Sequence, residues 1–212
     1  MENPVFTSLP HEKQERIIKA AMKEFTAGYK KASTDNIVKA AGISKGILFH
    51  YFGTKEKLHN YLIDYAIHIV QEEFLNLFTP VQKDILESVW QLSLLKRDLS
   101  LHFPDIFDFI AAAYMDKTIV NETVTNNLQK FWSKQAQFQA SVYQNVDTSL
   151  FKEEVDPTTA IKIITWTLDG FGQSKTHLAQ GENVGETLRD SYGLFLEELQ
   201  EILDTLRRCF YK

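Results

Sequence analysis

Apolar residues recur along most of this chain at spacings of three and four residues, and no long stretch alternates with a period of two. The first spacing is typical of amphipathic α-helices and the second of strands. Breaks fall where glycine, proline or short polar residues stand. The pattern predicts an all-α protein of about nine helices, near residues 10–26, 34–41, 45–52, 55–78, 83–101, 105–114, 122–145, 157–178 and 184–210. Residues 1–8 are predicted to be a polar, mobile lead-in.

Two of the predicted helices are short and meet at a tight turn. The hydroxyls of Ser33-Thr34 and of Ser44 stand where they can cap the two helix starts, and Gly42 supplies the left-handed residue on which the first helix can stop. In the second helix, Leu48 and Phe52 lie four residues apart on one face. A helix this short must dock by that face, which leaves the other face free. This arrangement is typical of a helix-turn-helix, whose second helix enters the DNA major groove.

The surrounding residues resemble the N-terminal domain of the TetR family of bacterial repressors. The resemblance rests on Ile17…Ala21…Phe25…Gly28-Tyr29, Ser33-Thr34…Ile37…Ala41-Gly42-Ile43-Ser44-Lys45-Gly46 and Leu48-Phe49-His50-Tyr51-Phe52-Gly53-Thr54-Lys55-Glu56-Lys57-Leu58. It implies a three-helix DNA-binding domain at residues 1–54. A helical ligand-binding and dimerisation domain would then occupy residues 55–212, with its first helix as the connector.

The resemblance also implies which residues contact DNA. Those that would face the groove or grip phosphates are Ser33, Thr34, Ser44, Lys45, Gly46, Ile47, Phe49, His50, Tyr51 and Lys55. Ile47 stands where the family commonly has a small or hydroxyl residue, and Phe49 where it often has tyrosine. Both lose a hydroxyl, and both can contact a thymine methyl group. For Phe49, a place in the core is a competing interpretation.

The charge of the chain is unevenly divided. Residues 1–57 hold 10 Lys and Arg against 6 Asp and Glu, whereas residues 58–212 hold 13 against 22, which gives +4 and −9 within a total of −5. A basic N-terminal part favours contact with phosphates at that end. Segments of this size also differ by a few charges without any such role, so the division only supports the interpretation.

An enzyme is the alternative class, and the sequence argues against it. The six histidines are scattered, and there is no HExxH motif, Cys/His cluster, nucleophile elbow or phosphate-binding loop. His68 and Glu72 could ligate a metal from one helix face, but a solvated pair is the better interpretation. We expect no catalytic site, metal or cofactor. A single cysteine and the lack of a signal or membrane-spanning segment predict a cytoplasmic protein with no membrane partner.

The acidic part is rich in aromatic residues. In the family, the middle helices enclose an inducer cavity, so we expect a small apolar effector bound near Trp90, His102, Phe103, Phe107, Phe109, Tyr114, Phe131, Trp132 and Phe138. For any one aromatic residue, core packing is the simpler explanation. His102, Asn127 and Gln135 are candidate polar anchors.

The last two long helices are apolar on more than one stripe, which predicts a homodimer interface at Trp166, Gly170, Phe171, Tyr192, Phe195 and Leu199. The expected function is a homodimeric repressor that a ligand releases from an inverted-repeat operator on double-stranded DNA. A ligand-independent DNA-binding regulator and a helical small-molecule-binding protein without DNA function remain as alternatives.

Overall fold

The computed structural model describes residues 3–77, 84–116, 146–178 and 190–212, together with residues 126, 127, 129, 130, 133, 134 and 137. Within these residues it has nine α-helices, one short 3-10 helix and no strand. A single antiparallel bridge joins Phe151 to Tyr211. The all-helical prediction is confirmed. The predicted helix at 122–145 and the start of the one at 184–210 lie largely outside the described residues.

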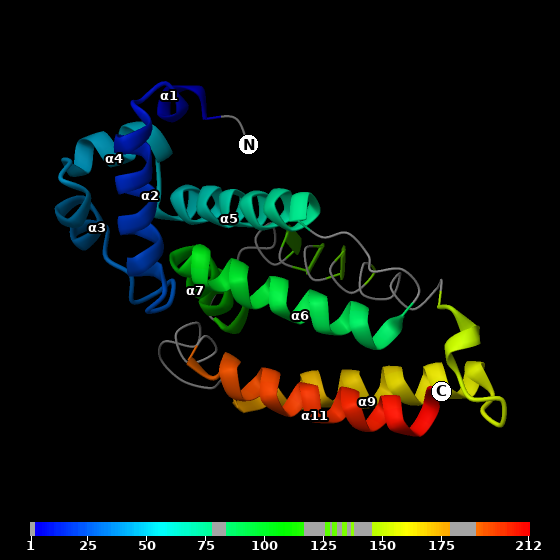
Figure 1. Cartoon of the computed structure of the whole chain (residues 1–212). Coiled ribbons are helices and arrows are strands. Elements are labelled where there is room, and N and C mark those ends of the chain that lie inside the picture. Colours follow the sequence, from blue (N-terminus) through cyan, green and yellow to red (C-terminus); the bar gives the residue numbers. More distant parts are fainter. Residues whose placement is uncertain are drawn as a thin grey trace.

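The helices form a head and a body (Figure 1). We call residues 3–52 the head, which contains α1 (Pro4–Thr7), α2 (His11–Phe25), α3 (Thr34–Ala41) and α4 (Lys45–Phe52). We call the described residues from 55 onwards the body. It contains α5 (Lys55–Leu77), α6 (Ile85–His102), α7 (Pro104–Met115), the 3-10 helix η1 (Thr148–Leu150), α9 (Pro157–Leu178) and α11 (Tyr192–Phe210). Helix α5 leaves the head, α6 lies along it, and the antiparallel pair α9 and α11 forms the far layer (Figure 1).

The turn between α3 and α4 forms as the sequence predicts. Gly42 ends α3 in the left-handed conformation, with φ of 65°. The side-chain oxygen of Ser44 accepts a hydrogen bond of 3.2 Å from the backbone N–H of Ile47 and so caps α4. Ser33 differs from the prediction, because its hydroxyl makes no capping bond. Its backbone N–H instead donates to the carboxylate of Glu24 in α2 at 2.8 Å, which fixes the start of α3 against α2.

The prediction of a mobile lead-in is wrong for residues 3–8. Asn3 caps the four-residue helix α1 through its side-chain oxygen, and Pro4 starts it without a lost hydrogen bond. Phe6 is fully buried against the rings of Phe52 and Tyr61, at centroid distances of 4.8 and 5.4 Å. This apolar anchor outweighs the polar composition of the segment and docks α1 onto the head.

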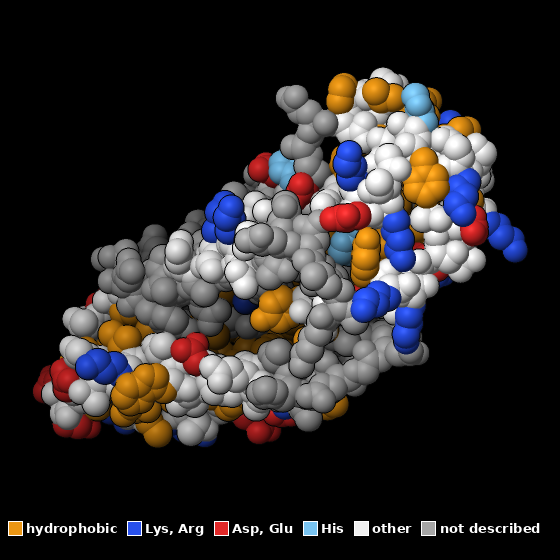
Figure 2. All heavy atoms as spheres, turned by 180° about the vertical axis from the view of Figure 1, so that it is seen from behind, with side chains coloured by type: hydrophobic (Ala, Val, Ile, Leu, Met, Phe, Trp, Pro, Cys, Tyr) orange, Lys and Arg blue, Asp and Glu red, His pale blue; other side chains and the backbone are white. Residues whose placement is uncertain are grey.

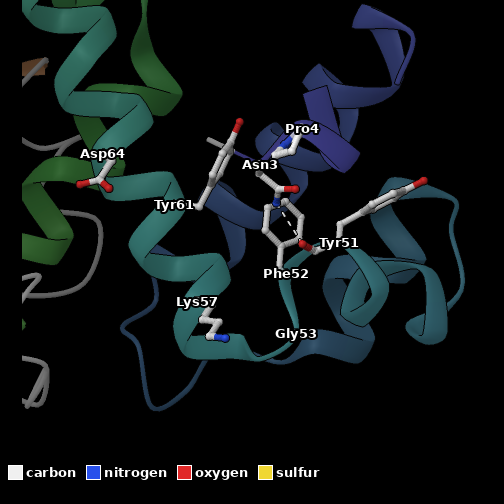
Figure 3. Close-up of a pocket in the computed structure, with 8 residues that line it drawn as sticks. All are labelled: Asn3, Pro4, Tyr51, Phe52, Gly53, Lys57, Tyr61 and Asp64. Atoms are coloured by element: carbon white, nitrogen blue, oxygen red, sulfur yellow. Dashed lines mark hydrogen bonds between the residues drawn. The ribbon is translucent and has the colours of Figure 1, made fainter. Parts of the chain in front are cut away.

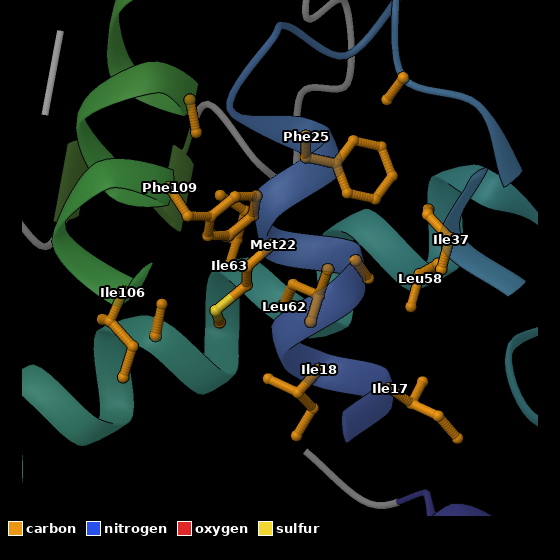
Figure 4. Packing of buried hydrophobic residues seen from close by; sticks show 14 of the residues in the cluster. Ile17, Ile18, Met22, Phe25, Ile37, Leu58, Leu62, Ile63, Ile106 and Phe109 are labelled. Atoms are coloured by element: carbon orange, nitrogen blue, oxygen red, sulfur yellow. The ribbon is translucent and has the colours of Figure 1, made fainter. Parts of the chain in front are cut away.

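One hydrophobic core joins the head to the body (Figure 4). Ile17, Met22 and Phe25 of α2 meet Leu62 of α5 and Phe109 of α7, and all five side chains are buried. A second core forms where the start of α6 packs against α9 and α11. The head therefore rests on α5 and α7, whereas the far layer has its own core.

Candidate nucleic-acid interface

Helix α4 presents one buried and one open face. Leu48 and Phe52 are buried in the head core, as predicted. Ile47 is 38% exposed, and Lys45 and His50 are also exposed. The helix therefore offers a cation, an apolar side chain and an imidazole to a neighbouring molecule, from residues that the fold does not use for packing.

Gly46 adds space to this open face. A Cβ atom at this position would meet only the Ser44 side-chain oxygen, at 3.9 Å, so the fold itself does not require glycine here. Phe49 is half-buried, between the two interpretations that the sequence left open. Without a side chain at Gly46, a partner can approach the first turn of α4 closely.

Lys45 is paired with Asp35 of α3 in this structure. Its ammonium lies 2.9 Å from the Asp35 carboxylate, and both side chains are largely exposed. Exposed ion pairs of this kind contribute little, about 0–1 kcal/mol. Lys45 can therefore exchange Asp35 for a phosphate or a base edge at small cost.

Lys55 is bound within the protein. Its ammonium donates to the carbonyl of Ala32 at 2.6 Å and stands over the ring of Tyr29 at 4.9 Å. Burial lowers the pKa of Lys55 from its ordinary value, while Glu24 opposes the change. Here Lys55 joins the start of α5 to the α2–α3 turn, although sequence reasoning placed it among the phosphate contacts.

Ser33, Thr34 and Tyr51 are half-buried at the edge of the helix-turn-helix. The Tyr51 ring lies 5.5 Å from the imidazole of His50 and 5.8 Å from the ring of Phe6. These contacts orient Tyr51 beside the open face of α4.

Helix α1 supports the end of α4 from behind (Figure 3). The side-chain amide of Asn3 donates to the backbone carbonyl of Tyr51 at 2.9 Å. An open groove of about 490 Å³ follows this contact, lined by Asn3, Pro4, Tyr51, Phe52, Gly53, Lys57, Tyr61 and Asp64. Sequence reasoning missed Asn3 and Phe6, although an Asn-Pro pair before an apolar residue is a helix-start signal.

The α2–α3 turn is tied directly to α7. The Asp116 carboxylate accepts a hydrogen bond of 2.7 Å from the backbone N–H of Tyr29. Gly28 has φ of 101°, and a Cβ atom there would come within 3.4 Å of the same carboxylate. Asp116 thus holds the turn at a place where glycine permits both the conformation and the approach.

His59 of α5 lies at the centre of this joint. It is 2% exposed, and its ring lies 4.8 Å from Phe25, 5.1 Å from Tyr29 and 5.5 Å from Phe109. Burial lowers the pKa of His59 to about 4, with Asp116 opposing the change. The imidazole is therefore neutral near pH 7, as an apolar setting requires.

The expected effector residues occupy different surroundings. Phe109 is fully buried in the core that joins head and body, while His102 and Tyr114 are exposed. Phe103 and Phe107 are half-buried beside Leu92 and Leu99 of α6. Trp90 packs against the α9–α11 core, and the side-chain amide of Asn127 donates to Asp64 at 2.7 Å. The remaining expected residues lie outside the described residues: Phe131, Trp132, Gln135 and Phe138.

The expected interface residues also differ in their surroundings, since some are exposed and others pack within the subunit. Trp166 is 69% exposed on α9, and a Cβ atom at Gly170 would meet nothing within 4 Å. Phe171 of α9 stacks on Phe195 of α11 at 5.0 Å and so joins the two helices within the subunit. Tyr192 meets Phe195 at 5.3 Å within α11. Leu199 is buried in the subunit's own core.

The described residues contain neither a cluster of metal-ligating side chains nor a membrane-spanning helix. No three His, Cys, Asp or Glu side chains there lie close enough together to hold a metal ion. Among the helices built from those residues, none is long and apolar enough to cross a membrane.

Comparisons with known proteins agree with this geometry. Residues 17–62 match the family model of bacterial regulatory proteins, tetR family. A TetR family transcriptional regulator from Chloroflexus aurantiacus J-10-FL has a similar fold, with a TM-score of 0.63, 23% identity and coverage of 98% of this chain and 97% of that one. A TetR family regulator from Agrobacterium tumefaciens gives 0.62 at 16% identity, covering 93% and 98%.

The ketosteroid transcriptional regulator KstR2 of Mycobacterium tuberculosis gives a TM-score of 0.57 at 13% identity, covering 97% of each chain. No curated protein matches the sequence. The structural likenesses extend over nearly the whole chain, so the body as well as the head has the fold of these regulators.

Proposed function

This chain carries a TetR-family helix-turn-helix DNA-binding domain in residues 17–62 on a TetR-like fold, and from that premise we propose that it is a cytoplasmic, homodimeric repressor that a small ligand releases from its operator. The observation that carries the proposal is the division of α4. Its inner face is buried in the head core, whereas Lys45, Ile47 and His50 are left open. A recognition helix needs this division, because its packing face sets its orientation and its open face reads bases.

The surface of the head favours the same partner. Figure 2 shows several Lys and Arg side chains over the head, where acidic ones are fewer. Cations beside a recognition helix bind phosphates and set its register on the duplex without reading sequence. In the free protein Lys45 is held by Asp35, so DNA must displace that contact.

A homodimer would form on the open side of α9. Ile163, Trp166 and Gly170 follow one another at spacings of three and four residues, and Ile163 and Trp166 are both exposed. An apolar stripe on a surface helix that no other described element covers favours contact with a second copy. Two heads related by two-fold symmetry would read an inverted repeat, with half-sites about one helical turn apart or somewhat more. Leu199 has no part in this interface.

Release by a ligand would use the joint between head and body. Phe103 and Phe107 stand at the start of α7, and the end of α7 holds the α2–α3 turn through Asp116. A ligand that displaces α7 would therefore move the head relative to α5. It can shift the equilibrium only by the difference between its affinities for the two states. A ligand-independent regulator would have the same head but no such coupling.

The DNA-binding part is tested by selecting a bound sequence from genomic fragments and then measuring affinity on it and on a scrambled duplex. Lys45→Ala and His50→Ala should lose about 1–3 kcal/mol on the selected site and little on the scrambled one. Arg208→Ala, at the far end of the body, is the matched control and should change neither. Equal losses on both duplexes for Lys45→Ala and His50→Ala would refute the assignment of α4 as the reading helix.

The variant Lys55→Ala tests whether Lys55 positions the protein on DNA or takes part in reading its sequence. It removes the contact with Ala32 and should weaken binding to both duplexes alike. If Lys55 also reaches a phosphate in the complex, the slope of log affinity against log salt should flatten by about one unit per half-site. An unchanged slope would assign Lys55 to holding the α2–α3 turn alone.

A further inference from the structure

Lys96 is a cation on the buried face of a helix. It stands in the middle of α6, four residues after Leu92 and three before Leu99, both of which are buried. Ser93 and Ser100, three residues before and four after it, are buried as well. These spacings place Lys96 on the same side of α6 as all four neighbours. A lysine on this face needs an explanation, because a charged group among buried neighbours costs free energy unless a partner compensates it.

No partner for Lys96 is found among the residues that the structure describes. It makes no ion pair or hydrogen bond with them, and the two neighbouring serines donate to backbone carbonyls of α6, at 2.9 Å for Ser93 to Val89 and 2.7 Å for Ser100 to Arg97. Burial lowers the pKa of Lys96 from its ordinary value. With the described residues the desolvated ammonium makes no compensating contact, which is costly for a charged group.

The side chain nevertheless retains some accessible surface. Lys96 is half-buried, whereas its neighbours along that face of α6 are buried. This accessible surface lies on the face of α6 that Lys96 shares with the buried Leu92 and Leu99. Figure 2 shows the body hollowed between its helices, with hydrophobic side chains in the opening. The apolar neighbours of this face are Leu92, Leu99, Leu95, Phe103 and Phe107.

We propose that the body binds an amphipathic organic anion, a monocarboxylic acid with an apolar chain or ring, whose carboxylate pairs with Lys96 and whose apolar part lies against the Leu92–Leu99–Phe103–Phe107 cluster. This inference rests on the proposed function, in that it names the chemical class of the effector. A carboxylate supplies the partner that the desolvated ammonium lacks, and the apolar cluster accepts the remainder of the molecule. Phe103 and Phe107 then connect the ligand to the start of α7.

The test compares acids with their neutral counterparts on the full-length protein. Octanoate and 3-phenylpropionate, each paired with its primary amide, are titrated by calorimetry at neutral pH against the wild type, Lys96→Met and Arg97→Met. The wild type should bind each acid about ten- to a hundredfold more tightly than its amide, as expected for one charge-assisted contact. Lys96→Met should lose this preference, and Lys96→Arg should keep most of it.

Arg97→Met is the matched control, because Arg97 is the adjacent cation and pairs with Asp98 on the exposed side of α6. It should bind like the wild type. Thermal unfolding checks that the variants fold, and Lys96→Met should melt no lower than the wild type without ligand, since it removes a desolvated charge. Equal binding of acid and amide, no binding of either acid, or a retained preference in Lys96→Met would each overturn the inference.

DNA affinity, measured on the same samples, separates this inference from the proposed function. If the acids bind through Lys96 but leave DNA affinity unchanged, ligand-released repression fails and the anion site stands. If only the amides bind and release DNA, the anion site fails and repression under ligand control stands.

Discussion

Acidification from pH 7 to pH 5 should destabilise this protein through His59. The pKa of His59 is about 4 in the folded chain, against 6.5 for an ordinary histidine. Between these values His59 binds a proton in the unfolded chain but not in the folded chain. The contribution of His59 to the free energy of unfolding is therefore fully present above pH 6.5 and decreases as the pH falls toward 4. Each pH unit in this window corresponds to about 1.4 kcal/mol, so lowering the pH from 7 to 5 should cost about 2 kcal/mol.

The assay is urea unfolding at pH 7 and pH 5 for the wild type and for His59→Phe, which keeps an aromatic ring but cannot take up a proton. Each protein is compared with itself at the two pH values, so any packing cost of the new ring cancels. His59→Phe should lose about 2 kcal/mol less than the wild type over this range. His68→Phe is the matched control, since His68 is exposed on the same helix. Equal losses in His59→Phe and in the wild type would refute the assignment.

Three further substitutions test separate parts of the structure. Phe6→Ala should lower the free energy of unfolding by about 3–5 kcal/mol and weaken DNA binding. Val5→Ala, at a side chain that is 49% exposed, should change stability by less than about 0.5 kcal/mol, and similar effects of the two would mean that α1 does not support α4. Gly170→Leu should shift sedimentation at micromolar concentration from dimer toward monomer, and unchanged association would remove Gly170 from the interface. Asp116→Ala should cost about 1.5 kcal/mol in chemical unfolding by removing the charge-assisted bond to Tyr29, and an unchanged midpoint would show that this bond does not hold the turn.

Local features of the sequence predict most of the helices and turns of the head. The cap at Ser44, the left-handed Gly42 and the four-residue spacing of Leu48 and Phe52 each act within one turn of helix, and the structure confirms all of them. The bounds of α2, α3 and α4 agree with the predicted ranges to within one or two residues. Such features depend on neighbouring residues alone, which is why the sequence suffices to predict them.

Contacts between distant segments were beyond this reasoning. Glu24 of α2 accepts a hydrogen bond from the backbone N–H of Ser33, where a hydroxyl cap was expected, and Lys55 turns inward to Ala32 in the α2–α3 turn. In each case the partner is supplied by a segment outside the helix to which the prediction referred. The position of Phe109 was equally hidden: its helical spacing marks it as buried, but only the packing of α7 on α2 determines in which core. A side chain that can serve an interface, a cavity or a core has the same sequence pattern in all three.

The core shared by α2 and α7 has a consequence for the order in which the protein acquires activity during synthesis. Tyr29 and its partner Asp116 are 87 residues apart in the sequence, and Phe109 closes the core from the same distant helix. A nascent chain that has released only the head and α5 has its recognition helix but lacks the α7 side of the core that holds it. Domains usually fold as units while they emerge from the ribosome. Here the unit that binds DNA is completed only with α7, so a fragment ending at residue 77, which has α5 but lacks α7, should show no cooperative thermal unfolding. A sharp transition in that fragment would contradict this order. The newly made chain thus becomes able to bind DNA only after α7 has been synthesised, and α7 is also the helix through which a ligand would release the DNA.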